Sequence, residues 1–220
     1  CNAAPGNVWF VKQNEDSMAR TSNRGNYPAE LLVLIQNWLA GLGDVIAEVE
    51  NFGLGGRTVG LTPDRYPQDA LQLVEEFQPH LIVLMLGTND GKFKYSQLWH
   101  SYESSLKDFV DTLTQPRFNH NDGGPCVVVA LSPPCLPNPH MDCEAIAGTI
   151  NSAQRRATEA TGAVLADVVA GFPSNELDSL IEEDNIHMNE AGSQRIASEV
   201  FRAMKGCLTS MFGETLSGRE

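Results

Sequence analysis

Hydrophobic and polar positions along the chain follow two periods. Nearly continuous apolar runs over residues 8–11, 81–86 and 126–131 predict buried strands, and further strands are expected over 45–52 and 164–168. Between them, apolar residues recur at helical spacing. In the first such stretch, which opens at Pro28 and ends before Gly41, Leu31 and Ile35 lie on one face. Helices are likewise predicted over 68–77, 97–113, 144–161 and 189–205.

Strands that alternate with helices predict parallel βαβ units. The simplest architecture is α/β, a three-layer α/β/α sandwich with a central parallel five-stranded sheet. The chain has 220 residues and no internal repeat, so we expect a single domain over 1–220, with a core over about 8–205 and a C-terminal tail over 206–220.

Charge narrows the classes of partner. Fifteen Lys and Arg against 28 Asp and Glu give a net charge of −13, and no basic stretch is visible, so no nucleic-acid partner is expected and a small or neutral substrate is favoured. No apolar run approaches the roughly 20 residues of a transmembrane segment. The chain begins at Cys1, which fits a fragment or a processed form. A secreted or periplasmic and a cytoplasmic location both stay open, as does the oligomeric state.

The five cysteines do not predict a disulfide framework, because their number is odd and they are scattered. Free thiols are the favoured interpretation, while Cys135 and Cys143 flank a short Pro-rich loop and would pair in an oxidising compartment. No metal site and no cofactor are predicted, since His140 with these two cysteines lacks a fourth ligand.

Polar residues follow the ends of the predicted strands, where parallel α/β sheets carry their sites. Ser17 follows the first strand. A serine hydroxyl needs a base to act as a nucleophile, and His187 is the best candidate because Asp184, three residues earlier, would orient its imidazole. Taken alone, Asp184 and His187 fit a helix-entry turn equally well.

The same loops offer donors for an oxyanion. The backbone N–H groups of Ser17 and Gly55 and the side-chain amide of Asn89 would stabilise the tetrahedral intermediate of acyl transfer. Each has a simpler explanation, since Gly55 and Asn89 are also common turn residues. Their combination in this order favours a hydrolase.

These motifs resemble the SGNH (GDSL-type) hydrolases from about residue 8 to 204. The resemblance is carried by Asp16-Ser17, by Gly55 in NFGLGGRT, by Gly87-Thr88-Asn89-Asp90 and by Asp184-Asn185-Ile186-His187. It implies a flavodoxin-like sandwich with a Ser17–His187–Asp184 triad and an oxyanion hole formed by Ser17, Gly55 and Asn89. One position departs from the family, because Glu15 stands where a glycine precedes Asp-Ser.

The pattern looks most like the branch of carbohydrate O-acetylesterases, which implies a short acyl group on a small-molecule or carbohydrate ester. The same scaffold is similar to lysophospholipases, thioesterases and arylesterases, and these stay open. Arg57, Asp90 and Met188 are candidate substrate contacts, with structural roles as the alternative. Glu15 motivates a further alternative, a weakly active or non-catalytic binding module.

Overall fold

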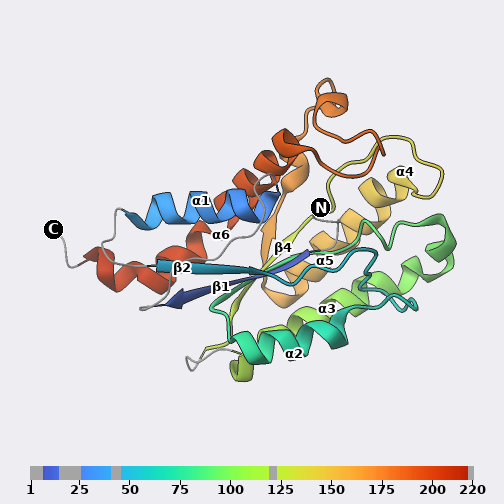
Figure 1. Cartoon of the computed structure of the whole chain (residues 1–220). Helices are drawn as coiled ribbons and strands as arrows, with labels where there is room; N and C mark the ends of the chain where they lie inside the picture. The colour runs from blue at the N-terminus through green and yellow to red at the C-terminus, as the bar shows by residue number, and fades with distance from the viewer. Residues whose placement is uncertain (1–6, 15–25, 41–45, 119–122, 218–220) are drawn as a thin grey trace.

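The structure is a computed structural model that describes residues 7–14, 26–40, 46–118 and 123–217 (Figure 1). Five strands form one sheet in these ranges, in the order β2-β1-β3-β4-β5. Their bounds are β1 Asn7–Asn14, β2 Ile46–Asn51, β3 Leu81–Met85, β4 Cys126–Ala130 and β5 Val164–Ala166.

Helices lie between and after the strands. The α-helices are α1 Tyr27–Leu39, α2 Pro67–Phe77, α3 Tyr102–Leu113, α4 Cys143–Ala145, α5 Asn151–Thr161 and α6 Glu190–Ser217. Shorter turns of 3₁₀-helix are η2 Phe93–Ser101, η3 Pro116–Phe118, η5 Val168–Gly171 and η6 Leu177–Ser179, and η4 Ile146–Ile150 is a π-helix. No helix in the described ranges is long and apolar enough to cross a membrane.

Two hydrophobic clusters cover the two faces of the sheet, so the predicted three-layer α/β/α fold is confirmed. Successive strand residues point to opposite faces. Val83 and Val128 therefore face the cluster with helices α1 and α6, whereas Ile82 and Val127 face the cluster with α2, α3 and α5. Figure 1 shows α1 and α6 together on one side of the sheet and α2 and α3 on the other.

Strand β1 departs from the expected all-parallel sheet. Strands β3, β4 and β5 pair in parallel, but β1 is antiparallel to both β2 and β3, so that Asn7 pairs with Met85 and Asn14 with Ile46. The carboxyl end of β1 therefore lies at the edge where β2 begins. An apolar run predicts that a strand is buried but not which way it runs, because either direction buries the same side chains.

Three helices also differ from their predicted bounds. The predicted helix over 97–113 begins as the 3₁₀-helix η2, and the one over 144–161 contains the π-helix η4. The last helix runs to Ser217, so residues 206–217 are not a tail. Leu208 and Phe212 are buried in the cluster with α1, which explains the continuation of α6, since their burial stabilises the extra turns.

The expectation of free thiols is wrong for four cysteines. Cys135 pairs with Cys143 across the loop that follows β4, with their Cα atoms 5.6 Å apart. Cys126 at the start of β4 pairs with Cys207 on α6, with Cα atoms 6.3 Å apart. Sequence spacing did not show the second pair because 81 positions separate its members, and only the packing of α6 on the sheet brings them together.

Candidate active site

One edge of the sheet carries the candidate active-site loops. Strands β2, β3 and β4 run in the same direction and end at this edge, followed by the loops that hold Gly55, Asn89 and Cys135. Helix α1 also begins on this side (Figure 1). We call this the site edge, and it is where an open α/β sheet holds its ligands.

The Asp184–His187 turn forms the expected acid–base pair. Asp184 Oδ1 accepts hydrogen bonds from the backbone N–H groups of Ile186 and His187, both at 2.9 Å, and Asp184 Oδ2 contacts His187 Nδ1. Asn185 between them has a left-handed backbone with φ of 65°, which asparagine tolerates better than most residues. The carboxylate therefore fixes both the turn and the imidazole.

Asp184 is ionised at neutral pH. Partial burial of its carboxylate acts to raise the pKa, but hydrogen bonds from the His187 and Ile186 backbone and from the His187 side chain outweigh it and lower the pKa of Asp184 below its usual value. An ionised carboxylate on Nδ1 requires a proton there, which leaves Nε2 of a neutral His187 as the basic nitrogen.

Asn89 lies in a tight turn whose shape depends on glycine. Gly87 has φ of 139°, and a Cβ on it would lie 2.5 Å from Ser132 Oγ and 2.8 Å from Tyr102 Oη. The turn is closed by Gly91 N–H, which donates to the Gly87 and Thr88 carbonyls at 3.1 Å. Asn89 is thereby held at the end of β3 with its side chain largely buried.

Asp90, a predicted substrate contact, lies buried with its carboxylate hydrogen-bonded inside the fold. Its side chain is 2% exposed, and its carboxylate accepts hydrogen bonds from Gly60 N–H at 2.8 Å and Val59 N–H at 3.2 Å. Burial raises the pKa of Asp90 to about 7, although the bonds from Gly60 and Val59 act to lower it. Asp90 instead ties the loop after β2 to the turn that holds Asn89.

Gly55 and Arg57 line a pocket of about 310 Å³ at the site edge. The other lining residues are Leu54, Gly56, Asp64 and Lys92. Arg57 forms a 3.5 Å ion pair with Asp69, whereas the half-buried Lys92 forms no ion pair within the described part of the chain. The pocket is polar, carries charges of both signs and adjoins the predicted oxyanion donor Gly55.

Met188 packs into the fold. It is half-buried against the cluster with α1 and α6, and a Cβ on Gly192 would lie 3.1 Å from Met188 Cβ. Its backbone bridges Ile181. These contacts give Met188 a structural role in holding the segment after His187.

Ser17, Asp16 and Glu15 lie outside the described residues. The segment 15–25 joins Asn14, at the edge where β2 begins, to Asn26 beside the start of α1 at the site edge (Figure 1). The structure thus brings Asp184 and His187 together and joins the Gly55 and Asn89 loops, while the nucleophile stays a prediction from the sequence.

Sequence reasoning missed three polar residues of the site edge. Asn138 and Asn185 hydrogen-bond between the loop after β4 and the Asp184–His187 turn, and Lys92 lines the pocket. The available signal was Asn138 between two prolines, since a residue before proline is biased to extended backbone that leaves its polar groups for neighbours.

In the described ranges, no three His, Cys, Asp or Glu side chains gather as metal ligands would.

A carboxylate–histidine pair at the site edge of a three-layer α/β fold supplies two of the three parts of a hydrolase triad. Comparison with known families agrees, because residues 16–195 match the model of the GDSL-like Lipase/Acylhydrolase family. The chain belongs to this family.

Individual relatives point the same way. The chain is similar to an acetylxylan esterase of Xylanibacter ruminicola, with 27% identity over 177 residues, and the match covers 71% of this chain and 35% of that protein. The chain therefore spans about a third of the length of this curated relative.

Solved structures share the fold. An alpha/beta hydrolase enzyme from the metagenome of Lake Arreo in Spain superposes with a TM-score of 0.63 at 24% identity, covering 83% of this chain and 82% of that one. A carbohydrate acetylesterase from Sinorhizobium meliloti has a TM-score of 0.57 at 18% identity, covering 90% and 93%. An aryl esterase of M. smegmatis has a TM-score of 0.59 at 18% identity, covering 90% and 94%.

Proposed function

We propose that this protein is a serine esterase that removes short acyl groups, chiefly acetyl, from carbohydrate esters through an acyl-enzyme intermediate. The observation that carries the proposal is the Asp184–His187 turn, in which one carboxylate holds both the backbone and the imidazole of the base. Ser17 is the nucleophile in this proposal, supported by its motif and by a family match that begins at residue 16.

The proposed reaction has two halves. Ser17 Oγ attacks the ester carbonyl while His187 Nε2 takes the hydroxyl proton, and the imidazolium is stabilised by Asp184. The Ser17 and Gly55 N–H groups and the Asn89 amide stabilise the oxyanion. His187 then gives the proton to the leaving alcohol, and water hydrolyses the acyl-enzyme by the same route in reverse.

The polar pocket beside Gly55 supports a sugar as the alcohol. Arg57, Asp64 and Lys92 offer charged donors and an acceptor to a hydroxyl-rich group, and the acetylxylan esterase similarity fits such a substrate. We expect Lys92→Met to raise KM for acetylated xylose oligomers several-fold and to leave p-nitrophenyl acetate, which has no sugar, unchanged. Lys107→Met on the exposed side of α3 removes the same charge outside the pocket lining and serves as the control. Equal loss on both substrates would contradict the role of the pocket.

A longer acyl or aryl group is the second candidate. Leu54, Leu61 and Phe93 are 43%, 57% and 50% exposed in the segments that follow β2 and β3, which would suit an apolar acyl chain. Rates on p-nitrophenyl esters from C2 to C12, with Ser17→Ala beside the wild type, separate the two. The acetylesterase proposal predicts a fall beyond about C4. A rise towards long chains would replace it by a lipid or thioester substrate with the same triad.

A further inference from the structure

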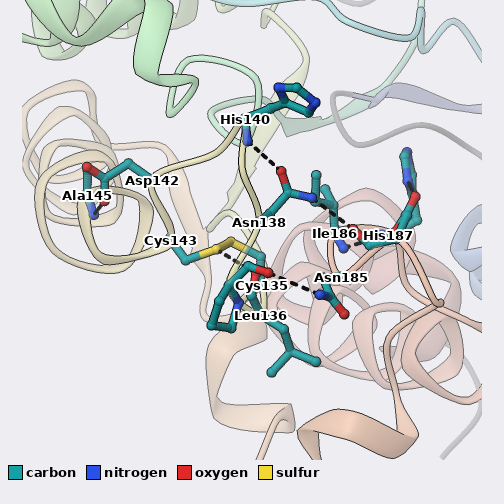
Figure 2. Close-up of a disulfide and its surroundings, with 12 residues drawn as sticks. Cys135, Leu136, Asn138, His140, Asp142, Cys143, Ala145, Asn185, Ile186 and His187 are labelled. Carbon is teal, nitrogen blue, oxygen red and sulfur yellow. Dashed lines mark hydrogen bonds and ion pairs between the residues drawn. A yellow bond between two sulfur atoms is a disulfide. The ribbon is translucent and has the colours of Figure 1, made fainter.

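The loop between Cys135 and Cys143 contacts two parts of the site edge at once. Leu136 N–H donates to the Asn185 carbonyl at 2.9 Å, Asn185 Nδ2 donates to the Pro137 carbonyl at 3.0 Å, and Asn138 Nδ2 donates to the Asp184 carbonyl at 2.9 Å. Figure 2 shows Leu136, Asn138 and Asn185 close to Ile186 and His187. Three hydrogen bonds thus fasten the loop to the Asp184–His187 turn.

The far side of the loop is fastened to the segment after Asn89. The His140 carbonyl accepts from Phe93 N–H at 3.2 Å, Asp142 N–H donates to the Gly91 carbonyl at 2.9 Å, and Met141 bridges Lys92. Asn138 connects the two sides, because its Oδ1 accepts from His140 N–H at 2.8 Å while its Nδ2 reaches Asp184 (Figure 2).

The loop has little regular structure of its own. It contains no strand or helix before α4, and Pro137 and Pro139 alternate with Leu136 and Asn138, which favours extended backbone. Such a segment makes no internal ladder of hydrogen bonds, so its shape depends on its bonds to neighbouring segments and on how its two ends are held. The Cys135–Cys143 disulfide joins those ends.

We propose that this disulfide-closed loop positions the base His187 relative to the oxyanion donor Asn89, with Asn138 and Asn185 as positioning residues. The inference rests on the proposed esterase function. Under this proposal, the rate of acyl transfer depends on the Cys135–Cys143 disulfide, although neither cysteine takes part in the reaction. Displacement of a catalytic group by about 1 Å can cost a hundredfold in rate.

The second disulfide provides a matched control. Cys126 lies at the start of β4, at the edge opposite the site, and its partner Cys207 is on α6. We expect Cys135→Ala/Cys143→Ala to lower kcat on p-nitrophenyl acetate about ten- to a hundredfold with little change in KM. Cys126→Ala/Cys207→Ala should leave kcat within about twofold while lowering Tm more, since it opens the longer loop.

Asn185→Gly tests the side-chain contact by itself. Glycine can adopt the left-handed backbone that Asn185 has, and it removes the side-chain bond to Pro137. We expect a several-fold fall in kcat at unchanged KM, and the same for Asn138→Ala. Wild-type kcat in both variants would overturn their positioning role.

Hydrogen exchange separates this inference from the proposed function. The amides of Ile186 and His187 bond to Asp184 Oδ1, so their exchange reports on the turn without any substrate. Faster exchange in Cys135→Ala/Cys143→Ala, with no change in Cys126→Ala/Cys207→Ala, supports the inference even if no ester is hydrolysed. Unchanged exchange together with unchanged kcat in the first variant would overturn it.

Discussion

Asp90 is a buried carboxylate that has no role in the proposed reaction. It accepts hydrogen bonds from Val59 and Gly60, and its burial raises its pKa to about 7. Between about pH 4, where an unfolded aspartate titrates, and pH 7, the folded chain binds this proton and the unfolded chain does not. The contribution of Asp90 to the free energy of unfolding is therefore most favourable below about pH 4, and it decreases as the pH rises towards 7.

Asp90→Asn mimics the protonated side chain and should remove this dependence. Its oxygen can still accept from Gly60, so we expect a Tm close to wild type at pH 4.5 and a higher Tm than wild type at pH 8. Thermal unfolding of both proteins across this range measures the difference. A wild type that gains stability relative to Asp90→Asn as pH rises would contradict the assignment.

Glu15 bears on the nucleophile. A carboxylate next to Asp16-Ser17 would oppose the negative charge that develops on the oxyanion, so a weak esterase is the expected consequence if it faces the site. Glu15→Gly restores the family residue. If Ser17 does not react, the alternative is a binding module without catalytic activity.

The turn after β3 depends on a glycine that no other residue can replace without movement. A Cβ at Gly87 would meet Ser132 Oγ and Tyr102 Oη, and the backbone there has φ of 139°. We expect Gly87→Ala to lower the free energy of unfolding by about 2–4 kcal/mol. Gly148→Ala in η4, where a Cβ meets nothing within 4 Å, is the matched control and should be neutral or slightly stabilising. Denaturant unfolding of both variants tests this, and equal effects would contradict it.

Strands β3 and β4 and helix α1 could be predicted because their apolar patterns leave one way to bury them. All five residues of β3 are buried, as its unbroken run LIVLM implies. The Asp184–His187 pair could also be predicted from the sequence, because two residues three positions apart come together within a single turn. The direction of β1 and the Cys126–Cys207 pair were not, because both depend on how distant segments pack.

The Cys126–Cys207 disulfide joins β4 of the sheet to α6, which packs on it. It closes a loop over a sequence separation of 81, and restriction of the unfolded chain by such a loop stabilises by about 4 kcal/mol. We expect Cys126→Ala/Cys207→Ala to lose about that much in urea unfolding. A loss below about 1 kcal/mol would contradict a stabilising role for this link.

The molecule as a whole carries a charge of −13 and a site edge built from three strand ends and one turn. In the proposed esterase mechanism, Ser17 is a nucleophile activated by His187. This requires the two residues to meet, although the strand before Ser17 ends at the edge opposite the site. Chemical reactivity tests that meeting directly.

The measurement is mass spectrometry of the protein after treatment with a fluorophosphonate, for wild type and His187→Ala, with Tm confirming that both are folded. We expect one adduct per chain on Ser17 in the wild type and its loss in His187→Ala. Absence of an adduct in the wild type, or labelling of Ser17 that does not depend on His187, would contradict it.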